Sequence, residues 1–356
     1  MKQDILQLLR HLRRCWRKIV IVHVIFTVLG LVLLTPLFGL LLQGALWLTG
    51  SSAVVDQEIA SLLLSPFGFV GGVLLLAILI AITGLELGAQ LLVAHDHLKG
   101  GSTPALQLVR YTFSRAPQLL ELTLRVTLRT LLYLLPYLAV VAGVAFALLT
   151  DYDINYYLSA KPREFYLAIA VAIVLALPLV WMLGRQLLDW SLSLPLLILG
   201  GEPARAALAD SATLVAGARS RCIAALAAWL VVALALGAVP VLFLNLGMDI
   251  VLGAGLSNLT TLVILLALLG AAWSLLNLVA GALTLGGLTL AITGLAPQLS
   301  GKLAQAEPVA GYRPDMEPRR LRWRRGGTIG FLIVVMAVGL LPRLLKSARF
   351  DKQVLS

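Results

Sequence analysis

Long apolar runs separated by short polar segments follow one another along the whole chain. Each run is long enough for a helix to cross about 30 Å of hydrocarbon, which takes roughly 20 residues. The runs lie near 19–40, 67–94, 118–149, 165–199, 223–247, 258–296 and 328–345. They lack the short alternating pattern of a transmembrane barrel, and a helix pairs its own backbone groups where lipid offers no partner. The pattern therefore predicts an all-α integral membrane protein with about seven transmembrane helices.

Composition supports this prediction. Hydrophobic residues make up 60% of the chain and charged residues only 13%, and the mean hydropathy is +0.96. These values exclude an ordinary water-soluble globular domain. A basic amphipathic segment precedes the first run, and no small-residue cleavage site follows it, so we expect the first span to be retained. Cys15 and Cys222 both fall on the expected cytoplasmic side, which disfavours a disulfide framework.

Basic residues are concentrated beside the first and the last apolar runs. Those before the first are Lys2, Arg10, Arg13, Arg14, Arg17 and Lys18, and those before the last are Arg319, Arg320, Arg322, Arg324 and Arg325. The loop at 50–66 carries Asp56 and Glu58 and no basic residue. Because cytoplasmic loops carry the excess of Lys and Arg, we expect a cytoplasmic N-terminus, and seven crossings then place residues 346–356 on the extracytoplasmic side.

The net charge of +11 comes from residues placed beside apolar runs, a distribution that fixes orientation and attracts anionic lipid headgroups. We therefore expect membrane lipids as partners, and no nucleic acid. Arg125 and Arg129, near the cytoplasmic end of the third run, are expected to reach lipid headgroups. The same role is expected for the five arginines from Arg319 to Arg325.

Two segments about a hundred residues apart resemble each other. "GGSTPALQLVRYTFSRAP" begins at Gly100 and "GGEPARAALADSATLVAGARS" begins at Gly200. Each has paired glycines, a proline suited to the first helical turn, and an amphipathic stretch that ends in arginines. The periodicity places Leu106, Val109 and Phe113 on one face of the first stretch, and it places Ala204, Ala207, Leu208, Ser211 and Val215 on one face of the second.

A proline recurs at equal distance within the spans that follow these stretches. Pro136 lies as far after Arg115 as Pro240 lies after Arg219. The N-terminal segment has the same plan, with Pro36 in its span. We infer three parallel repeats, each an interfacial amphipathic helix followed by two spans. The expected organisation is repeat one at 1–99, repeat two at 100–199, repeat three at 200–300, a basic cytoplasmic linker at 301–327, a final span at 328–345 and a tail at 346–356.

Charged and polar residues at membrane depth are the candidate functional residues. Glu86, Arg185 and Asp189 lie within apolar runs, and a charge there costs at least about 2.5 to 3.5 kcal/mol unless it meets water or a partner. Glu86 and Arg185 occupy matching places in successive repeats, and Asn277 is the candidate in the third. We expect these four to converge inside the bundle. Such a cluster would either line a path for lipid or solute, or fix the helix packing.

No catalytic or metal-binding motif is recognisable in the chain. "HDHLKGG" at 95–101 places His95 and His97 around Asp96, but consecutive residues on a helix point in different directions, which disfavours a metal site. No phosphate-binding glycine loop, dinucleotide fingerprint, serine elbow or paired-cysteine zinc site occurs. We therefore expect neither catalytic nor metal-binding residues in this sequence.

Several segments together resemble a known family. They are "VVDQEIASLLLSPFGFVGGVLLL" at 54–76, "QLLVAHDHLKGG" at 90–101, "LSLPLLILGGEPARAALADSATLVAGARSR" at 192–221 and the basic stretch before the final span. In this order they resemble the membrane domain of bacterial membrane-bound glycerophosphodiester phosphodiesterases, over most of residues 1–345. The resemblance implies location in the bacterial cytoplasmic (inner) membrane.

In that family a soluble (α/β)8 catalytic barrel follows the final span. Its His-Arg-Gly and Pro-Glu-Asn-Thr motifs supply catalytic histidines and a carboxylate site for a divalent cation. Neither motif occurs here. The resemblance therefore carries no catalytic residue or cofactor onto this chain, and the cation would belong to the barrel. The sequence is either the membrane portion of such an enzyme, with its tail leading toward the barrel, or a relative without one.

Two functions follow from the sequence. The first is a membrane domain of glycerolipid metabolism that anchors a glycerophosphodiester phosphodiesterase, as a C-terminal or a separate domain, and supplies lipid-derived substrate to it. The second is a stand-alone transporter or lipid-translocating protein, for which parallel repeats and intramembrane charges are typical.

Overall fold

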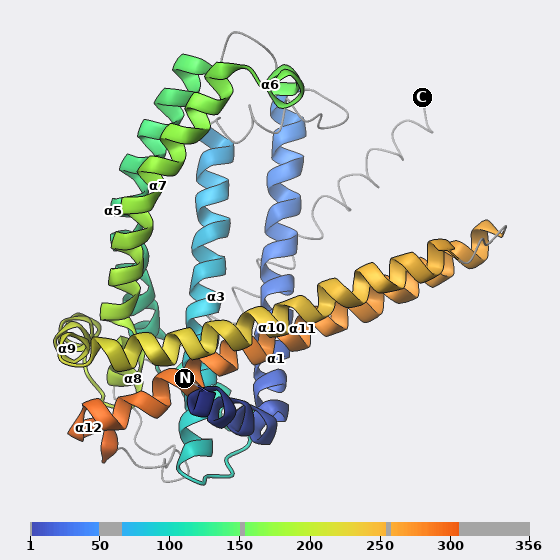
Figure 1. Ribbon diagram of the computed structural model, residues 1–356. Helices are drawn as coiled ribbons and strands as arrows, with labels where there is room; N and C mark the ends of the chain where they lie inside the picture. Colours follow the sequence, from blue (N-terminus) through green and yellow to red (C-terminus); the bar gives the residue numbers. More distant parts are fainter. Residues whose placement is uncertain (1, 50–65, 150–153, 254–257, 306–356) are drawn as a thin grey trace, which may run out of the picture. The chain divides into compact units, whose positions relative to one another are not determined.

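The computed structural model describes residues 2–49, 66–149, 154–253 and 258–305, and all secondary structure in these ranges is helical (Figure 1). The long helices are α1 (Lys2–Thr49), α3 (Pro66–Leu98), α5 (Ala116–Leu148), α7 (Arg163–Trp190), α10 (Arg219–Gly253) and α11 (Leu259–Leu299). The shorter helices are α4 (Ala105–Ser114), α6 (Ile154–Ala160), α8 (Ser193–Ile198), α9 (Ala204–Ala216) and α12 (Gly301–Ala304).

Within the described residues, six helical segments are long and apolar enough to cross a membrane. They are Ile5–Gly44, Phe67–Leu98, Ala116–Leu148, Arg163–Ile198, Arg219–Gly253 and Leu259–Leu299. These six match the first six predicted spans, so a multi-pass helical membrane protein is confirmed. The predicted final span at 328–345 and the tail at 346–356 lie outside the described residues.

The N-terminal amphipathic segment and the first span belong to one helix. An interfacial amphipathic helix was expected before the span at 19–40, and α1 includes both, from Lys2 to Thr49. No glycine or proline separates the amphipathic residues from the apolar run, so nothing in the sequence ends the helix there. Pro36 lies inside α1.

The chain divides into two compact units, one built from residues 1–26 and 81–310 and the other containing 27–80. In the second unit, glycines allow α1 and α3 to approach closely. A side chain at Gly44 would collide with Phe67, and one at Gly71 would collide with Leu41. Small residues at such contacts are typical of helices that pack inside membranes.

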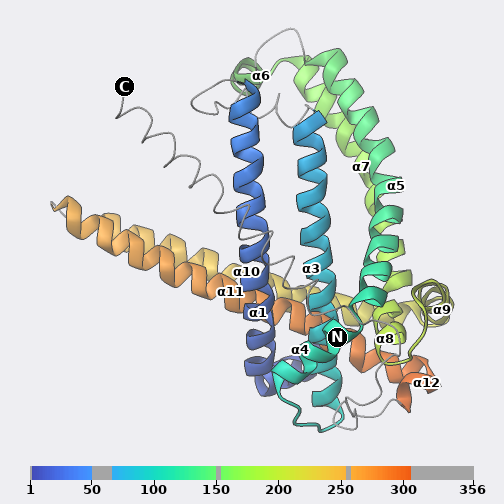
Figure 2. The same ribbon diagram turned by 180° about the vertical axis from the view of Figure 1, so that it is seen from behind.

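In the first unit, two pairs of long helices run side by side. α5 lies along α7, and α10 lies along α11, in both views (Figures 1 and 2). The indole nitrogen of Trp229 on α10 donates a hydrogen bond to the carbonyl of Thr284 on α11, at 2.8 Å. Asn258 caps α11, since its side-chain oxygen accepts from the backbone N–H of Thr260 at 2.9 Å.

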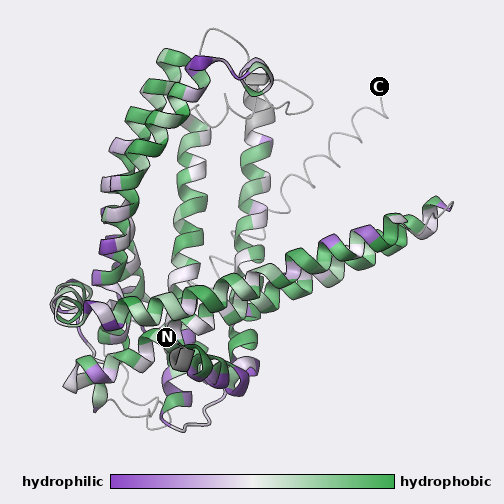
Figure 3. Cartoon of the chain, viewed as in Figure 1, coloured by the Kyte–Doolittle hydropathy of each residue, from purple (hydrophilic) through white to green (hydrophobic). Residues whose placement is uncertain are grey.

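The long helices expose large apolar side chains over most of their length. Leu132, Phe146, Trp181 and Ile250 are among the exposed residues, and Figure 3 shows hydrophobic residues along α5, α7, α10 and α11. In water such a surface would be unfavourable, whereas lipid acyl chains cover it without cost. The exposed surface therefore agrees with a bilayer environment.

The buried core of the first unit involves the N-terminal part of α1 and the C-terminal parts of α3 and α11. On α1 the buried residues follow one face: Leu8, Leu12, Cys15, Ile19, Val22 and Phe26. Gly286 of α11 faces Ile19, where an added Cβ atom would lie 2.6 Å from the Cδ1 atom. Glycine at this position thus permits close packing of α11 on α1.

The five residues predicted to share a face of the short helix α9 form its buried side. Ala204, Ala207, Leu208, Ser211 and Val215 are all buried, and α9 packs against α5, α7 and α8. The hydroxyl of Ser211 donates to the carbonyl of Asp189 at 2.6 Å and accepts from the backbone N–H of Leu192 at 3.1 Å. These bonds fasten α9 to the turn between α7 and α8.

The three residues predicted to share a face of α4 have different exposure, because Val109 is buried and the other two are exposed. The buried residues are Ala105, Leu108, Val109 and Thr112, whereas Leu106 is 70% exposed and Phe113 is 45% exposed. Leu106 and Phe113 are the two largest apolar side chains of that face. In a membrane protein lipid can also receive such side chains, so size alone does not identify the buried face.

Candidate functional site

Polar contacts join the N-terminal part of α1 to the C-terminal part of α3. Four pairs of residues form this polar ladder: His23 with Glu86, Ile19 with Gln90, Lys18 with Asp96, and His11 with His97. The residue numbers fall along α1 as they rise along α3, as expected for antiparallel helices. The polar ladder therefore begins within the spans and ends beside the Gly100–Gly101 loop.

The first pair lies within the apolar part of both helices. Nδ1 of His23 lies 2.5 Å from Oε1 of Glu86, and the two side chains are 16% and 9% exposed. A carboxylate at this depth is costly without a partner, and the imidazole supplies one. Gly281 of α11 lies next to the other ring nitrogen of His23, since a Cβ atom there would be 3.4 Å from Nε2.

Gln90 lies one turn further along α3 and is completely buried. Its amide nitrogen donates to the backbone carbonyl of Ile19 at 3.0 Å. A side-chain amide that bonds to the backbone of a neighbouring helix stabilises the helix pair in a membrane, by roughly 0.6 to 2 kcal/mol for one bond. Gln90 therefore fixes the position of α3 along α1.

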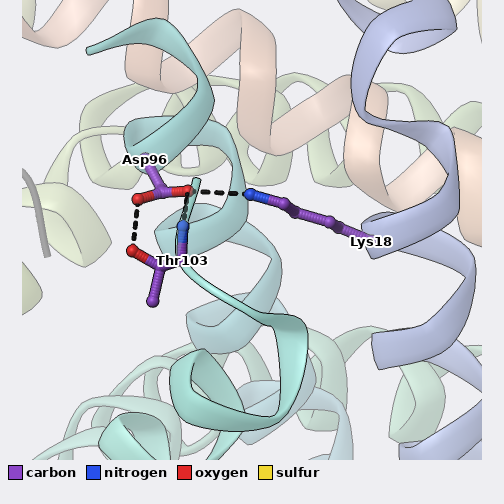
Figure 4. A network of polar contacts seen from close by, with 3 residues as sticks. All are labelled: Lys18, Asp96 and Thr103. Carbon is purple, nitrogen blue, oxygen red and sulfur yellow. Dashed lines mark hydrogen bonds and ion pairs between the residues drawn. The ribbon is translucent and has the colours of Figure 1, made fainter. Parts of the chain in front are cut away.

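Asp96 is the most fully buried charge of the polar ladder, with no exposed side-chain surface. Lys18 Nζ donates to Oδ2 at 3.0 Å, the backbone N–H of Thr103 donates to the same oxygen at 3.1 Å, and the Thr103 hydroxyl donates to Oδ1 at 2.6 Å (Figure 4). Three donors, one of them cationic, compensate for removing this carboxylate from water.

The Gly100–Gly101 loop is shaped around Asp96. The backbone N–H of Gly101 donates to the backbone carbonyl of Asp96 at 2.7 Å, and a side chain at Gly101 would collide with the Asp96 carboxylate. Gly100 has a φ of +75°, a conformation that glycine adopts without strain. The paired glycines thus allow the chain to turn back so that Thr103 reaches Asp96.

Histidine is concentrated in this region. The chain has four histidines, and all lie on α1 or α3. Nδ1 of His11 is 3.3 Å from Nε2 of His97, so one of these nitrogens carries the shared hydrogen. His95 is buried. Among the described residues, no group of three or more His, Cys, Asp or Glu side chains is arranged to hold a metal ion.

The four predicted intramembrane residues have different surroundings. Glu86 belongs to the polar ladder. Oδ1 of Asp189 lies 3.9 Å from Nη2 of Arg219, Arg185 is exposed, and exposed Asn277 donates to the carbonyl of Trp273 in its own helix at 3.4 Å. No hydrogen bond or ion pair joins any two of these four side chains, all of which are described, and their convergence stays a prediction.

The predicted headgroup-binding arginines on α5 have partners within the protein. Nη2 of Arg125 lies 2.8 Å from Oε1 of Glu121, in a pair whose side chains are 44% and 49% exposed. The guanidinium of Arg129 lies over the Trp190 ring, 5.9 Å from its centre. Arg319, Arg320, Arg322, Arg324 and Arg325 lie outside the described residues.

Sequence reasoning missed His23 and Lys18 as partners of the buried acids. One signal was available, because a histidine inside an apolar run is unusual and requires a partner. The sequence did not show which acid it meets, since that depends on how two helices far apart in the chain pack together.

Comparison with known proteins identifies the family. Residues 5–338 match the family model described as the membrane domain of glycerophosphoryl diester phosphodiesterase. No curated protein and no solved structure gives a significant match. The matched residues include the polar ladder, both Gly-Gly segments and the six described helical segments that are long enough to span a bilayer. Since the family model covers nearly the whole chain, this protein belongs to the family of glycerophosphoryl diester phosphodiesterase membrane domains.

Proposed function

We propose that this chain anchors a glycerophosphodiester phosphodiesterase in the bacterial cytoplasmic membrane and presents lipid-derived substrate to it. The family match over residues 5–338 is the observation that carries this proposal. In the proposed arrangement the phosphodiesterase, as a C-terminal or a separate domain, supplies the catalytic residues and the divalent cation. The membrane domain holds the phosphodiesterase at the membrane and gives it access to glycerolipids.

The proposed topology has seven spans, with the final one at 328–345. The N-terminus lies in the cytoplasm and the phosphodiesterase on the extracytoplasmic side. The distribution of basic residues supports this orientation, because six precede the first span and none occurs in the loop at 50–66. Labelling of single cysteines in intact cells tests it. Equal reactivity of positions near both ends of the chain would contradict the topology.

The proposed three parallel repeats are supported by the local geometry of α4 and α9. Both helices begin directly after a proline in extended conformation, Pro104 and Pro203. Their buried residues occupy corresponding positions, with Ala105, Leu108, Val109 and Thr112 of α4 equivalent to Ala204, Ala207, Leu208 and Ser211 of α9. Each is followed by a long helix with an internal proline, Pro136 in α5 and Pro240 in α10.

Presentation of substrate is proposed because anchoring alone requires one span, and this chain has at least six helices long enough to cross. In this proposal the spans recruit glycerolipid products and keep them near the phosphodiesterase. The polar ladder supports a structural role for Glu86, since its carboxylate is occupied by His23.

The proposal is tested by attaching the phosphodiesterase domain either to this chain or to one unrelated transmembrane helix. We expect both fusions in the membrane fraction, with faster hydrolysis of bilayer-derived glycerophosphodiesters only for the first. Equal hydrolysis would contradict presentation of substrate while leaving anchoring intact. Recovery of the first fusion in the soluble fraction would contradict anchoring.

The alternative is transport of lipid or solute, and the buried Glu86–His23 pair is the observation that favours it. Ionisable groups inside membrane spans often mark transport pathways. In this alternative Glu86, Arg185, Asp189 and Asn277 line the path. Flux across proteoliposomes that depends on Glu86 or Arg185 would support transport, whereas lipid that co-purifies without such flux would support the membrane-domain function.

A further inference from the structure

Helix α4 presents three different sides, and only one of them is covered by protein. Its buried residues, Ala105, Leu108, Val109 and Thr112, form the protein-facing side. Successive residues lie about 100° apart around a helix, so the exposed residues of α4 divide into two groups. Leu106, Arg110 and Phe113 lie on one flank, and Gln107 and Ser114 lie opposite the protein. All five are exposed.

The flank formed by Leu106, Arg110 and Phe113 is apolar with a basic edge. Leu106 is 70% exposed and Phe113 is 45% exposed. One face of the Phe113 ring stacks on Phe26, with the ring centres 5.8 Å apart, so the apolar surface continues from the core of the unit to its outside. Arg110 lies between this apolar flank and the polar side.

Arg110 is available for a ligand. Within the described part of the chain it forms neither a hydrogen bond nor an ion pair, and α4 contains no acidic residue. The next arginine, Arg115, differs, because its guanidinium lies over the Tyr111 ring and donates to the side chain of Gln118 at 3.2 Å. The exposed cation of α4 thus lies beside exposed leucine and phenylalanine.

The position of α4 in the chain places it at a bilayer surface. The span α3 ends at Leu98 and the span α5 begins at Ala116, so α4 connects the same-side ends of two membrane-crossing helices. A helix at this boundary has protein on one side, acyl chains on a second and water on a third. Apolar residues beside a basic residue are the pattern of a helix that lies in the headgroup region.

We propose that the flank of α4 docks on the bilayer, with Leu106 and Phe113 at the acyl-chain boundary and Arg110 on the phosphate of an anionic phospholipid. This proposal does not depend on whether the chain anchors a phosphodiesterase. Charge complementarity selects the anionic lipid, since a basic group near such a surface is attracted to it.

Helix α9 provides a control within the same molecule. At the places that correspond to Leu106, Arg110 and Phe113, it has Arg205, Ala209 and Ala212. Its protein-facing side is equivalent to that of α4, but this flank lacks any large apolar side chain. Asp210 is also exposed on α9. The site that docks on the bilayer is therefore expected on α4 and not on α9.

Single cysteine variants carrying an environment-sensitive fluorophore test the depth of the flank. Leu106→Cys, Gln107→Cys and Arg205→Cys are made in the full chain and placed in vesicles of phosphatidylcholine and phosphatidylglycerol. The native Cys15 and Cys222 are buried, and unsubstituted protein gives the labelling background. We expect brominated acyl chains to quench the label at position 106 strongly and those at 107 and 205 weakly.

Equal weak quenching at 106 and 107 would overturn the proposal. Energy transfer between labels on separate copies at position 106, without quenching by lipid, would also overturn it and would identify a second copy as the occupant. Because the same fluorophore is attached at 205, quenching there as strong as at 106 would also overturn the proposal, since the flank of α4 would then not differ from that of α9.

Removal of the charge tests the lipid class. Quenching at position 106 is compared for brominated phosphatidylglycerol and brominated phosphatidylcholine at equal content. We expect a preference for the anionic lipid of about fivefold, which corresponds to about 1 kcal/mol for one cation near an anionic surface. Arg110→Gln should abolish this preference, and Arg205→Gln should retain it. A preference that survives Arg110→Gln would overturn the assignment of Arg110.

Discussion

Lys18 on α1 and Asp96 on α3 form an ion pair in which the carboxylate has no exposed surface, with Nζ and Oδ2 3.0 Å apart. Thr103, from the loop that follows α3, completes the coordination of this carboxylate. One side chain therefore joins three segments of the first unit. This arrangement makes Asp96 the residue on which the polar ladder depends most.

Lys18→Met should destabilise the protein, because it leaves the buried carboxylate with Thr103 alone. Loss of one member of a buried pair costs about 3 to 5 kcal/mol, and we expect a value near the lower limit, since Lys18 is 28% exposed. Thermal unfolding in detergent measures the change. Glu121→Gln is the control, because it breaks the exposed pair with Arg125 and should cost about 1 kcal/mol or less. Equal losses for the two variants would contradict a special role for Asp96.

Gly101→Ala should destabilise the loop, because the methyl group would collide with the Asp96 carboxylate. We expect a loss of about 1 to 3 kcal/mol, the usual range for overpacking. The matched variant is Gly217→Ala, where the nearest atom to the new methyl is the Leu214 carbonyl oxygen at 3.8 Å. That replacement should be neutral or slightly stabilising. Both variants are compared by thermal unfolding. An unchanged unfolding temperature for Gly101→Ala would show that the loop can move away from Asp96.

His23 and Glu86 should be energetically coupled. His23→Ala and Glu86→Ala each leave the other polar group without its partner, whereas the double variant removes both. A double-mutant cycle on unfolding stability should therefore give an interaction energy within about 0.5 to 3 kcal/mol. Additive effects would contradict a direct interaction. The same cycle for Glu86 and Arg185 tests their proposed convergence, since coupling there requires a shared environment.

Gly286→Leu should weaken the packing of α11 on α1, because even a Cβ atom there would lie 2.6 Å from Ile19 Cδ1. We expect a loss of about 1 to 3 kcal/mol, with partial recovery when Ile19→Ala is added. Gly294→Leu is the control, since no atom lies within 4 Å of a Cβ atom at that position. Absence of recovery in the double variant would argue that the loss does not come from contact with Ile19.

Hydrophobic length allowed six of the membrane-crossing helices to be predicted, because lipid thickness imposes the same requirement on every span. The face that Ala204, Ala207, Leu208 and Ser211 share on α9 was also predictable, since these residues follow helical spacing. Which side of α4 meets the protein was not predictable, because large apolar side chains such as Leu106 and Phe113 can face either lipid or protein. Apolar character alone does not distinguish these two environments.

The residue pairs of the polar ladder could be identified only from the structure. Glu86 was identified as a candidate from its depth in an apolar run, but its partner His23 is far away in the sequence and becomes apparent only when α1 and α3 are packed together. Periodicity describes one helix at a time and contains no information about the offset between two. The identity of Lys18 as the partner of Asp96 could not be predicted for the same reason.

The bonds of Asp96 also have a mechanical consequence. Thr103 lies just before α4, and the same carboxylate that accepts its two hydrogen bonds accepts the bond from Lys18. A change in lateral pressure at the bilayer surface that displaces α4 must therefore stretch these bonds or carry α1 with it. The first helix of the chain is in this way tethered to α4, the helix that we propose docks on the bilayer.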